Sequence, residues 1–433
     1  MTAGTQAPPC PKLESAVFLE PGPKPNPYPE YGRIREKSPI YQLPGANGRS
    51  AYLLTRFEDV NRLLRGGDFG HDDSLATDPD ELTGNPLQRF MTKRLLALAG
   101  PFIQMAGHWM LTVNPPYHSH LRGQVGRAFL PRAIEAQRDA ILRIADELID
   151  ARLATGTMDV RGDFSYPLAI YVIGELIGVP REDHPRLKRL ARHLALGIDP
   201  NLSGGSRFML VRQALLFREV SRAARELQVY FSDLVEQRRR EPRDDLLSTL
   251  VATDAEGDGL TREELVDTCI LLMVAGHITT VDLIGNGMLA LFRNPEQLAL
   301  LRGDLDLAEG AVEEMLRYDS PVQLTSRVVR QPAEVAGVPL RPGDSTIVLL
   351  GAANRDPAEF AAPEAFDITR SPNRHLAFAA GIHFCIGAAL ARLEAQVAVK
   401  RLLERLPNLA LAEEPRWGTG TVLRGVESLP VRF

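Results

Sequence analysis

The stretch LAFAAGIHFCIGAALAR, residues 376–392, places a lone cysteine among glycines and small residues just before an apolar helical segment. Backbone amides of such a loop, with the dipole of the helix that follows, stabilise a thiolate at Cys385. Gly381 and Gly387 would let the backbone approach a flat ligand without a Cβ clash. The stretch therefore indicates a functional cysteine, and the rest of the sequence bears on which function it has.

Four roles for Cys385 are open. A structural buried cysteine is the usual case, although the flanking glycines and aromatic residues weigh against it. A zinc or iron–sulfur site needs about four ligands, and the chain has three cysteines in all. A catalytic thiol needs a positioned base such as His383, but one intervening residue rarely gives that geometry. The fourth role is an axial thiolate ligand to haem iron, with Phe378 and Phe384 excluding water.

The composition is that of an ordinary soluble globular protein with a large core. The 433 residues are 44% hydrophobic and 24% charged, and the net charge of −5 gives no support for nucleic-acid binding. Three cysteines fit a reducing cytoplasm better than a disulfide framework. The N-terminus lacks a signal peptide's apolar core, and the most apolar run, 269–276, is shorter than a bilayer span of about 20 residues. We therefore expect a cytoplasmic protein without a membrane segment.

Hydrophobic periodicity predicts a mainly helical chain with a small β-region. Residues 1–30 are rich in proline and form an expected extended arm, whereas 31–433 form an expected single catalytic domain. Residues 50–64 begin like a strand and continue like a helix, and 326–350 alternate like short strands. The stretch 68–113 is expected to be a long irregular lid over a cavity.

One predicted helix is far longer than the usual 8–20 residues. It begins with a capping box, Thr261 and Glu264, and ends before Pro295. Gly276 and Thr279 weaken its middle, because an interior glycine costs roughly 1 kcal/mol and a threonine hydroxyl can bond to the carbonyl four residues earlier. Two explanations are equally open: a neighbour packs closely against Gly276, or a small ligand binds beside the kink.

FAAGIHFCIGAALAR resembles the haem-binding loop of the cytochromes P-450, with Ala379 where glycine or serine is more common. Four further segments resemble that family in the same order along the chain, so the resemblance covers nearly the whole sequence: NPPYHSHLR (114–122), AGHITT (275–280), EEMLRYDSP (313–321) and ANRDPAEFAAPEAFDITR (353–370). It implies the family's mainly α fold with a small β-region. One haem b (iron protoporphyrin IX) would lie between the central long helix and the cysteine loop.

The resemblance also implies a role for individual residues. Cys385 would be the metal ligand, and Phe378 would shield it. The haem propionates would be bound by His118, Arg122, Arg327 and His383. Glu314 and Arg317 would form a buried structural pair, joined by Arg370, that docks the segment after the helix.

Thr279 is the catalytic candidate besides Cys385, because the resemblance implies that its hydroxyl relays protons during dioxygen activation. The family usually has an acid immediately before it, and this chain has Ile278. Two hypotheses follow. Either the substrate or a water chain supplies the proton and hydroxylation is retained, or the reaction is a different oxidation such as oxidative coupling or desaturation.

The resemblance implies a monooxygenase, monomeric, that hydroxylates or epoxidises a mid-sized hydrophobic or amphipathic intermediate of secondary metabolism. Dioxygen would be the oxidant, and a ferredoxin with its ferredoxin reductase would supply electrons. Candidates for the substrate-pocket lining are Val274, Ala275, Ile278, Val322 and Leu324.

Two rival functions remain at this stage, a cysteine-dependent hydrolase and a haem sensor or carrier. The basic residues that follow the cysteine, Arg392, Lys400 and Arg401, either form a docking face for an acidic electron donor or are a solvated face.

Overall fold

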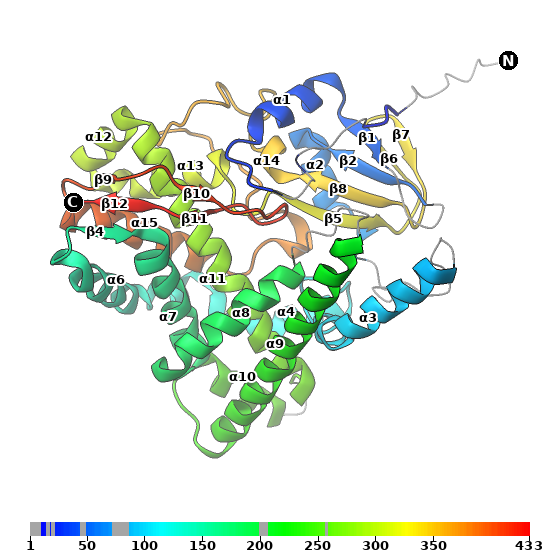
Figure 1. Ribbon diagram of the computed structural model, residues 1–433, viewed down its shortest axis with the longest axis horizontal. Helices are drawn as coiled ribbons and strands as arrows, with labels where there is room; N and C mark the ends of the chain where they lie inside the picture. The colour runs from blue at the N-terminus through cyan, green and yellow to red at the C-terminus, as the bar shows by residue number, and fades with distance from the viewer. Residues whose placement is uncertain are drawn as a thin grey trace.

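The structure is a computed structural model that describes residues 10–13, 18, 22–43, 49–71, 86–198, 207–255 and 259–433. Figure 1 shows the main sheet at one end of the molecule, with most of the helices gathered at the other. The helices are α1 Tyr28–Lys37, α2 Phe57–Arg65, α3 Pro86–Ala106, α4 Tyr117–Gly126, α5 Pro131–Glu135, α6 Arg138–Leu153, α7 Tyr166–Ile177, α8 His184–Ile198, α9 Arg207–Arg240, α10 Leu246–Ala255, α11 Arg262–Arg293, α12 Pro295–Gly303, α13 Ala308–Tyr318, α14 Leu350–Ala353 and α15 Ala388–Arg405.

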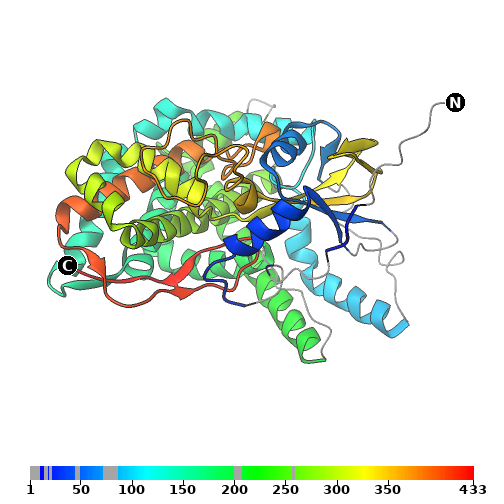
Figure 2. The same cartoon turned by 90° about the horizontal axis from the view of Figure 1, so that it is seen from above.

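The strands are short and form one larger sheet and three small ones. They are β1 Ile40–Leu43, β2 Ala51–Leu54, β3 Phe69–Gly70, β4 Thr157–Asp159, β5 Leu324–Val329, β6 Ala333–Val335, β7 Val338–Leu340, β8 Ser345–Leu349, β9 Ala410–Leu411, β10 Arg416–Trp417, β11 Val426–Ser428 and β12 Pro430–Arg432. The larger sheet has the order β1-β2-β8-β5-β3, in which only β2 and β8 are parallel. Figure 2 shows this sheet from above, beside the helical part. The strands predicted within 326–350 and the strand and helix within 50–64 are confirmed.

The helix α11 is the predicted long helix. Thr261 caps it by accepting a hydrogen bond from the Glu264 amide, and the Glu264 carboxylate accepts one from the Thr261 amide. By length and apolar composition α11 could cross a membrane, but 83% of its apolar window is buried within the protein. It is therefore the core helix of the fold, as its all-round apolar surface predicts.

The expectation of an irregular lid over 68–113 is wrong for most of its described residues. They form β3 and the helix α3, even though Pro101 lies inside that helix. Pro101 removes one amide donor but does not end the helix, because α3 packs along α9. The Ser221 hydroxyl on α9 donates a 2.6 Å hydrogen bond to the Leu98 carbonyl.

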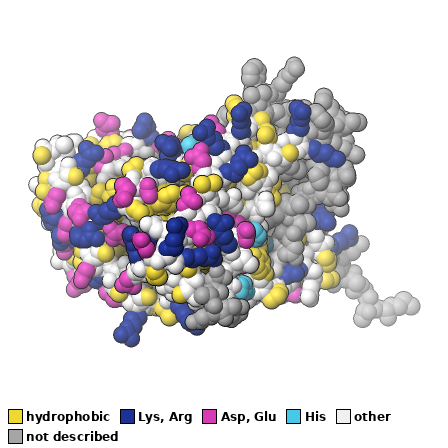
Figure 3. Space-filling model, turned by 90° about the horizontal axis from the view of Figure 1, so that it is seen from below, with side chains coloured by type: hydrophobic (Ala, Val, Ile, Leu, Met, Phe, Trp, Pro, Cys, Tyr) yellow, Lys and Arg dark blue, Asp and Glu magenta, His cyan; other side chains and the backbone are white. Residues whose placement is uncertain are grey.

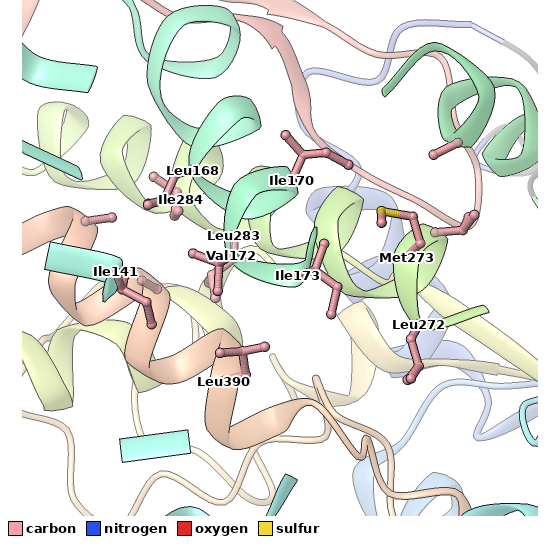
Figure 4. Close-up of a cluster of buried hydrophobic side chains, with 14 of the residues drawn as sticks. Ile141, Leu168, Ile170, Val172, Ile173, Leu272, Met273, Leu283, Ile284 and Leu390 are labelled. Atoms are coloured by element: carbon pink, nitrogen blue, oxygen red, sulfur yellow. The ribbon is translucent and has the colours of Figure 1, made fainter. Parts of the chain in front are cut away.

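The main hydrophobic core surrounds α11. Figure 4 shows side chains of α7, α11 and α15 meeting there, among them Ile173, Leu283 and Leu390. A Cβ added at Gly276 would lie 3.2 Å from the Ile173 side chain. Close packing of α7 thus explains Gly276, and of the two explanations for the weak helix middle this one has direct support.

Part of the proline-rich N-terminal segment packs against the protein. Phe18 and Tyr28 are buried in a cluster with Leu53 and Leu349 of the sheet. The division at residue 30 into an arm and a single domain stays a prediction. On the surface seen from below, acidic and basic side chains are interspersed over the described residues (Figure 3).

Candidate active site

The loop before α15 holds Cys385 through backbone hydrogen bonds. The Cys385 amide donates to the Phe378 carbonyl at 3.0 Å, and the Ala388 amide donates to the Cys385 carbonyl at 3.4 Å. Gly381 is required on two counts: its φ is +71°, and a Cβ would lie 2.2 Å from the Leu64 carbonyl oxygen. The packing of this loop against α2 therefore fixes the position of the sulfur.

The Cys385 side chain is accessible from one side although it lies deep in the fold. This depth raises the pKa of the thiol, while a hydrogen bond from the Gly387 amide and the charges of Arg122 and Arg392 lower it. If a metal ion bound the sulfur in place of the thiol proton, the same amide and cations would still stabilise the thiolate. Phe384 is 41% exposed, and the centroid of its ring lies 6.3 Å from that of Phe378. The loop itself therefore carries two neighbouring aromatic rings.

A cluster of nitrogen donors lies next to this loop. The ring of His383 is 4.3 Å from that of His118 and 4.6 Å from that of His71, measured between centroids. Burial is the main reason why the pKa of His71 and of His383 falls to about 3, and neighbouring cations lower both further. Arg327 is 6% exposed, and burial lowers its pKa to about 10. Arg122 donates to the Phe384 carbonyl at 2.8 Å.

These donors lack acceptors within the described residues. The Nε2 atoms of His71, His118 and His383 are buried without a hydrogen-bond partner, and Arg327 bonds only to the Thr325 hydroxyl and a backbone carbonyl. Buried donors of this kind require an acceptor, and a carboxylate satisfies them best. An exposed thiol and a neighbouring cluster of buried nitrogen atoms, without partners in the described part of the chain, fit a haem with its two propionates.

His71 is a site residue that the sequence analysis did not find. β3 pairs with β5 in the register Gly70 to Val328, which brings His71 next to Arg327. The Asn114 side chain fixes the His71 backbone, accepting from its amide and donating to its carbonyl. The only local signal was a histidine directly after a short strand, which by itself predicts no function.

The middle of α11 presents one accessible face. Ala275 is exposed, and Ile278 and Thr279 are partly exposed, although they lie in the core helix. The Thr279 hydroxyl donates to the Ala275 carbonyl at 3.0 Å, as the sequence predicts. Of the five predicted lining residues, Val322 is also partly exposed.

The other two residues predicted to line the pocket, Val274 and Leu324, are buried in the structure, and their place in the lining stays a prediction. Val274 is 1% exposed within the core around α11, and Leu324 is 8% exposed within the cluster of Phe18 and Leu53. Both belong to the core because neighbouring elements cover the faces on which they lie.

His277 and Asp282 turn away from the accessible face. His277 Nδ1 donates to the Met273 carbonyl at 2.6 Å, so its Nε2 accepts the Tyr166 hydroxyl at 3.1 Å. Asp282 pairs with Arg161. Neither side chain replaces the acid that is missing at Ile278.

Glu314 binds two arginines in the interior. Its carboxylate lies 2.8 Å from the Arg317 guanidinium and 3.1 Å from that of Arg370, and it also accepts from Asn373. Arg317 further donates to the carbonyls of three residues, Asn354, Pro363 and Ala365. The cluster thus fastens the segment 354–373 to α13.

The basic residues after the cysteine are all paired within the chain. Arg392 binds Glu313, Lys400 binds Asp306 and Arg401 binds Asp146. An electron donor would have to compete with these internal carboxylates, which weakens the case for them as a docking face.

The chain is similar to known proteins along nearly its whole length. A model of the cytochrome P450 family matches residues 206–411. The chain is 40% identical over 425 residues to the biotin biosynthesis cytochrome P450 of Bacillus subtilis strain 168, covering 97% of this chain and 98% of that protein. It is 35% identical over 410 residues to 6-deoxyerythronolide B hydroxylase of Saccharopolyspora erythraea, covering 94% and 96%. The structure of P450BioI in complex with an acyl carrier protein ligated to hexadec-9Z-enoic acid aligns with a TM-score of 0.81 at 38% identity, covering 97% of this chain and 100% of that one.

The cysteine loop, the donor cluster and the accessible face of α11 are the features expected of a haem-thiolate protein. Identity of 40% across almost the whole chain narrows this to one family. The chain belongs to the cytochrome P450 family and is a monooxygenase, which works with haem, dioxygen, a redox partner and an organic substrate. The predicted fold class is confirmed, and the hydrolase and the sensor are excluded.

Proposed function

We propose that this monooxygenase contains haem b and hydroxylates or epoxidises a mid-sized hydrophobic or amphipathic intermediate of secondary metabolism. The observation that carries the proposal is the Cys385 loop facing a cluster of unsatisfied buried donors. The mostly apolar accessible residues of α11 support an apolar substrate. The name of the 35%-identical hydroxylase supports oxygen insertion.

In this proposal Cys385 would hold the haem iron, and its thiolate would supply electron density that favours O–O bond cleavage. His118, Arg122, Arg327, His383 and the added His71 bind the propionates. Thr279 is the catalytic hydroxyl on α11, since it lies on the accessible face. Its one O–H hydrogen is donated to the Ala275 carbonyl, so the hydroxyl would have to rotate away from that carbonyl to pass a proton onward.

We further propose a cytoplasmic monomer that receives electrons from a ferredoxin and a ferredoxin reductase. Support for the location is compositional, since three unpaired cysteines fit a reducing compartment.

A non-hydroxylating oxidation, such as desaturation or oxidative coupling, is the second candidate. Ile278 supports it, because an apolar residue stands where the family usually has an acid. Neither His277 nor Asp282 faces the site to replace that acid.

The substrate itself is proposed to arrive as a thioester on an acyl carrier protein. The 38%-identical relative supports this, because its structure holds a carrier protein with a fatty acid attached. The accessible residues of α11 are compatible with a long acyl chain.

A reduced carbon-monoxide difference spectrum tests the core of the proposal. Cys385→Ser should remove the strongly red-shifted Soret band of thiolate ligation, whereas Cys10→Ser, which changes a cysteine outside the loop, should retain it. Retention of the band by Cys385→Ser would refute the assignment. Turnover with a surrogate ferredoxin pair and product analysis then separates hydroxylation from desaturation or coupling.

A further inference from the structure

The helix α8 carries charges of a single sign. Its 15 residues include Arg186, Lys188, Arg189 and Arg192, and they contain no aspartate or glutamate. The three arginines are exposed, whereas Leu187, Leu190, Ala191 and Leu194 of the same helix are buried. The chain as a whole has a net charge of −5, so this cationic stripe is opposite in sign to the net charge of the protein.

The neighbouring helix α9 extends this stripe. The Arg186 guanidinium lies 5.7 Å from the centroid of the Tyr230 ring, and a Cβ at Gly197 would lie 2.9 Å from Val220. The two helices are therefore antiparallel, and the middle of α8 faces residues 222–226 of α9. There α9 exposes Arg222 and Arg225, and Arg218 one turn earlier.

Few of these cations have a carboxylate partner. Within the described residues, Arg222 is paired with Glu226, but Arg186, Arg189 and Arg192 form no ion pair, and neither do Arg218 and Arg225. Burial and then the charge of Arg192 lower the pKa of Lys188, which shows how close these cations are. Glu219 is the one exposed acid on this part of α9. Mutual repulsion makes such a group costly unless a partner neutralises it.

Exposed apolar side chains flank the arginines. Leu215 and Val229 on α9 are 55% and 61% exposed, and Leu196 at the end of α8 is 44% exposed. Arginine is enriched at protein interfaces, and an exposed apolar side chain beside it adds surface that a partner can bury. Arginine binds carboxylates and phosphates alike in a bidentate manner, and the carrier protein in the structure of the 38%-identical relative favours a protein partner over a lipid surface.

We propose that the exposed face of α8 and α9, centred on Arg186, Arg189, Arg192 and Arg225, is the docking surface for the acidic carrier protein that delivers the substrate. This inference rests on the carrier-bound substrate proposed above. α8 and α9 both pack on α11, so a carrier docked there lies over the helix that bears Thr279. The face is separate from the ion-paired residues that follow the cysteine.

The test compares two triple charge reversals in the haem-loaded protein. The docking variant changes Arg186→Glu, Arg189→Glu and Arg192→Glu. The matched control changes Lys37→Glu, Arg62→Glu and Arg341→Glu, which are exposed and outside this face. Binding is followed by fluorescence anisotropy of labelled hexadecanoyl-acyl carrier protein, and in parallel by the spin-state change that free hexadecanoic acid induces.

The docking variant should bind the carrier protein at least tenfold more weakly, the control within twofold of wild type, and free acid binding should not change in either. Equal carrier affinity in the docking variant, or no carrier binding by wild type, overturns the inference. A third outcome would assign the face to a membrane instead. In that case wild type binds vesicles with 30% anionic lipid, and the docking variant loses vesicle binding but retains carrier binding.

The carbon-monoxide spectrum of every variant is also recorded. A normal spectrum shows that the haem site is intact, so a failure of carrier docking does not count against the monooxygenase assignment. If the charge reversals disturb folding, the double neutralisation Arg189→Gln and Arg192→Gln replaces them. It should then weaken carrier binding at least threefold, and unchanged binding again overturns the inference.

Discussion

Among single residues, Ala379 stands out because its conformation conflicts with its side chain. Its φ is 57°, in the left-handed region, where an L residue loses roughly 1–2 kcal/mol. Glycine avoids that cost but loses roughly 0.5–1 kcal/mol through its freedom in the unfolded chain. Ala379→Gly should therefore stabilise the protein by up to about 1 kcal/mol, measured as a higher thermal midpoint of the haem-loaded protein.

Gly381→Ala is the matched comparison two residues later. Its φ is also positive, but here a Cβ would meet the Leu64 carbonyl oxygen at 2.2 Å. This substitution should lower the thermal midpoint and release haem on purification. A destabilised Ala379→Gly, or a stable Gly381→Ala that keeps its haem, would contradict this account of the loop.

Ile278 stands where the family usually has an acid, so the source of protons for the site is the open question at this residue. If the substrate or a water chain supplies them, a carboxylate at this partly exposed position brings its own hydration into an apolar site. Ile278→Glu should then lower the yield of product per NAD(P)H consumed several-fold. Ile278→Leu keeps the volume and should keep the yield. Unchanged yield and product with Ile278→Glu would mean that the position has little influence.

Local pattern singled out Cys385, because it lies in a continuous glycine-rich loop. Glu314 and Arg317 share one helical face, but their role came from the family resemblance, as did the roles of most other site residues. His71 escaped notice because its contact with Arg327 arises from pairing between β3 and β5, which lie more than 250 positions apart. The burial of Val274 was equally out of reach, since the packing of other elements decides which helix face is accessible.

At the scale of elements, α11 was predictable and α3 was not. Continuous apolar residues and the capping box identify α11 without any tertiary information. In α3, Gly100 and Pro101 are strong signals for a break. The helix persists because packing along α9, with the hydrogen bond from Ser221 to the Leu98 carbonyl, outweighs those local preferences.

The anchoring of α11 to α7 should depend on pH through His277. Burial is the main cause that lowers the pKa of His277 to about 4, compared with about 6.5 in an unfolded chain. Between these values the unfolded state binds the extra proton, so stability present above pH 6.5 is lost as the pH falls towards 4. This group alone accounts for roughly 2–3 kcal/mol of that loss.

His277→Phe removes this titration, and the Tyr166 hydroxyl can then donate to the Lys188 carbonyl, 3.3 Å away, instead of to the imidazole. Urea unfolding of the haem-loaded variant should therefore show a shallower decline between pH 7 and pH 4.5 than wild type, whatever its absolute stability. Parallel declines would show that His277 does not titrate in this range on unfolding.

Considered as a whole, the molecule brings three separate segments together at the buried carboxylate of Asp267. His108, in the segment between α3 and α4, lies 2.7 Å from the Asp267 carboxylate of α11. Gln228 of α9 donates to the other oxygen of Asp267 at 2.9 Å. Asp267 is 2% exposed, so this contact ties the segment after α3 to a buried carboxylate of the core helix, although the His108 side chain is partly exposed.

Asp267→Asn should loosen this contact without disturbing the haem site. A hydrogen bond to a charged group contributes roughly 1.5–3 kcal/mol, so the α3 segment should open about tenfold more often. Hydrogen–deuterium exchange should rise in α3 and in residues 107–113 but not in α15. Stopped-flow substrate binding should show faster association and dissociation with an unchanged carbon-monoxide spectrum. Asp233→Asn, an exposed position on α9, is the control, and equal exchange in the two variants would mean that α3 is held by its packing on α9 alone.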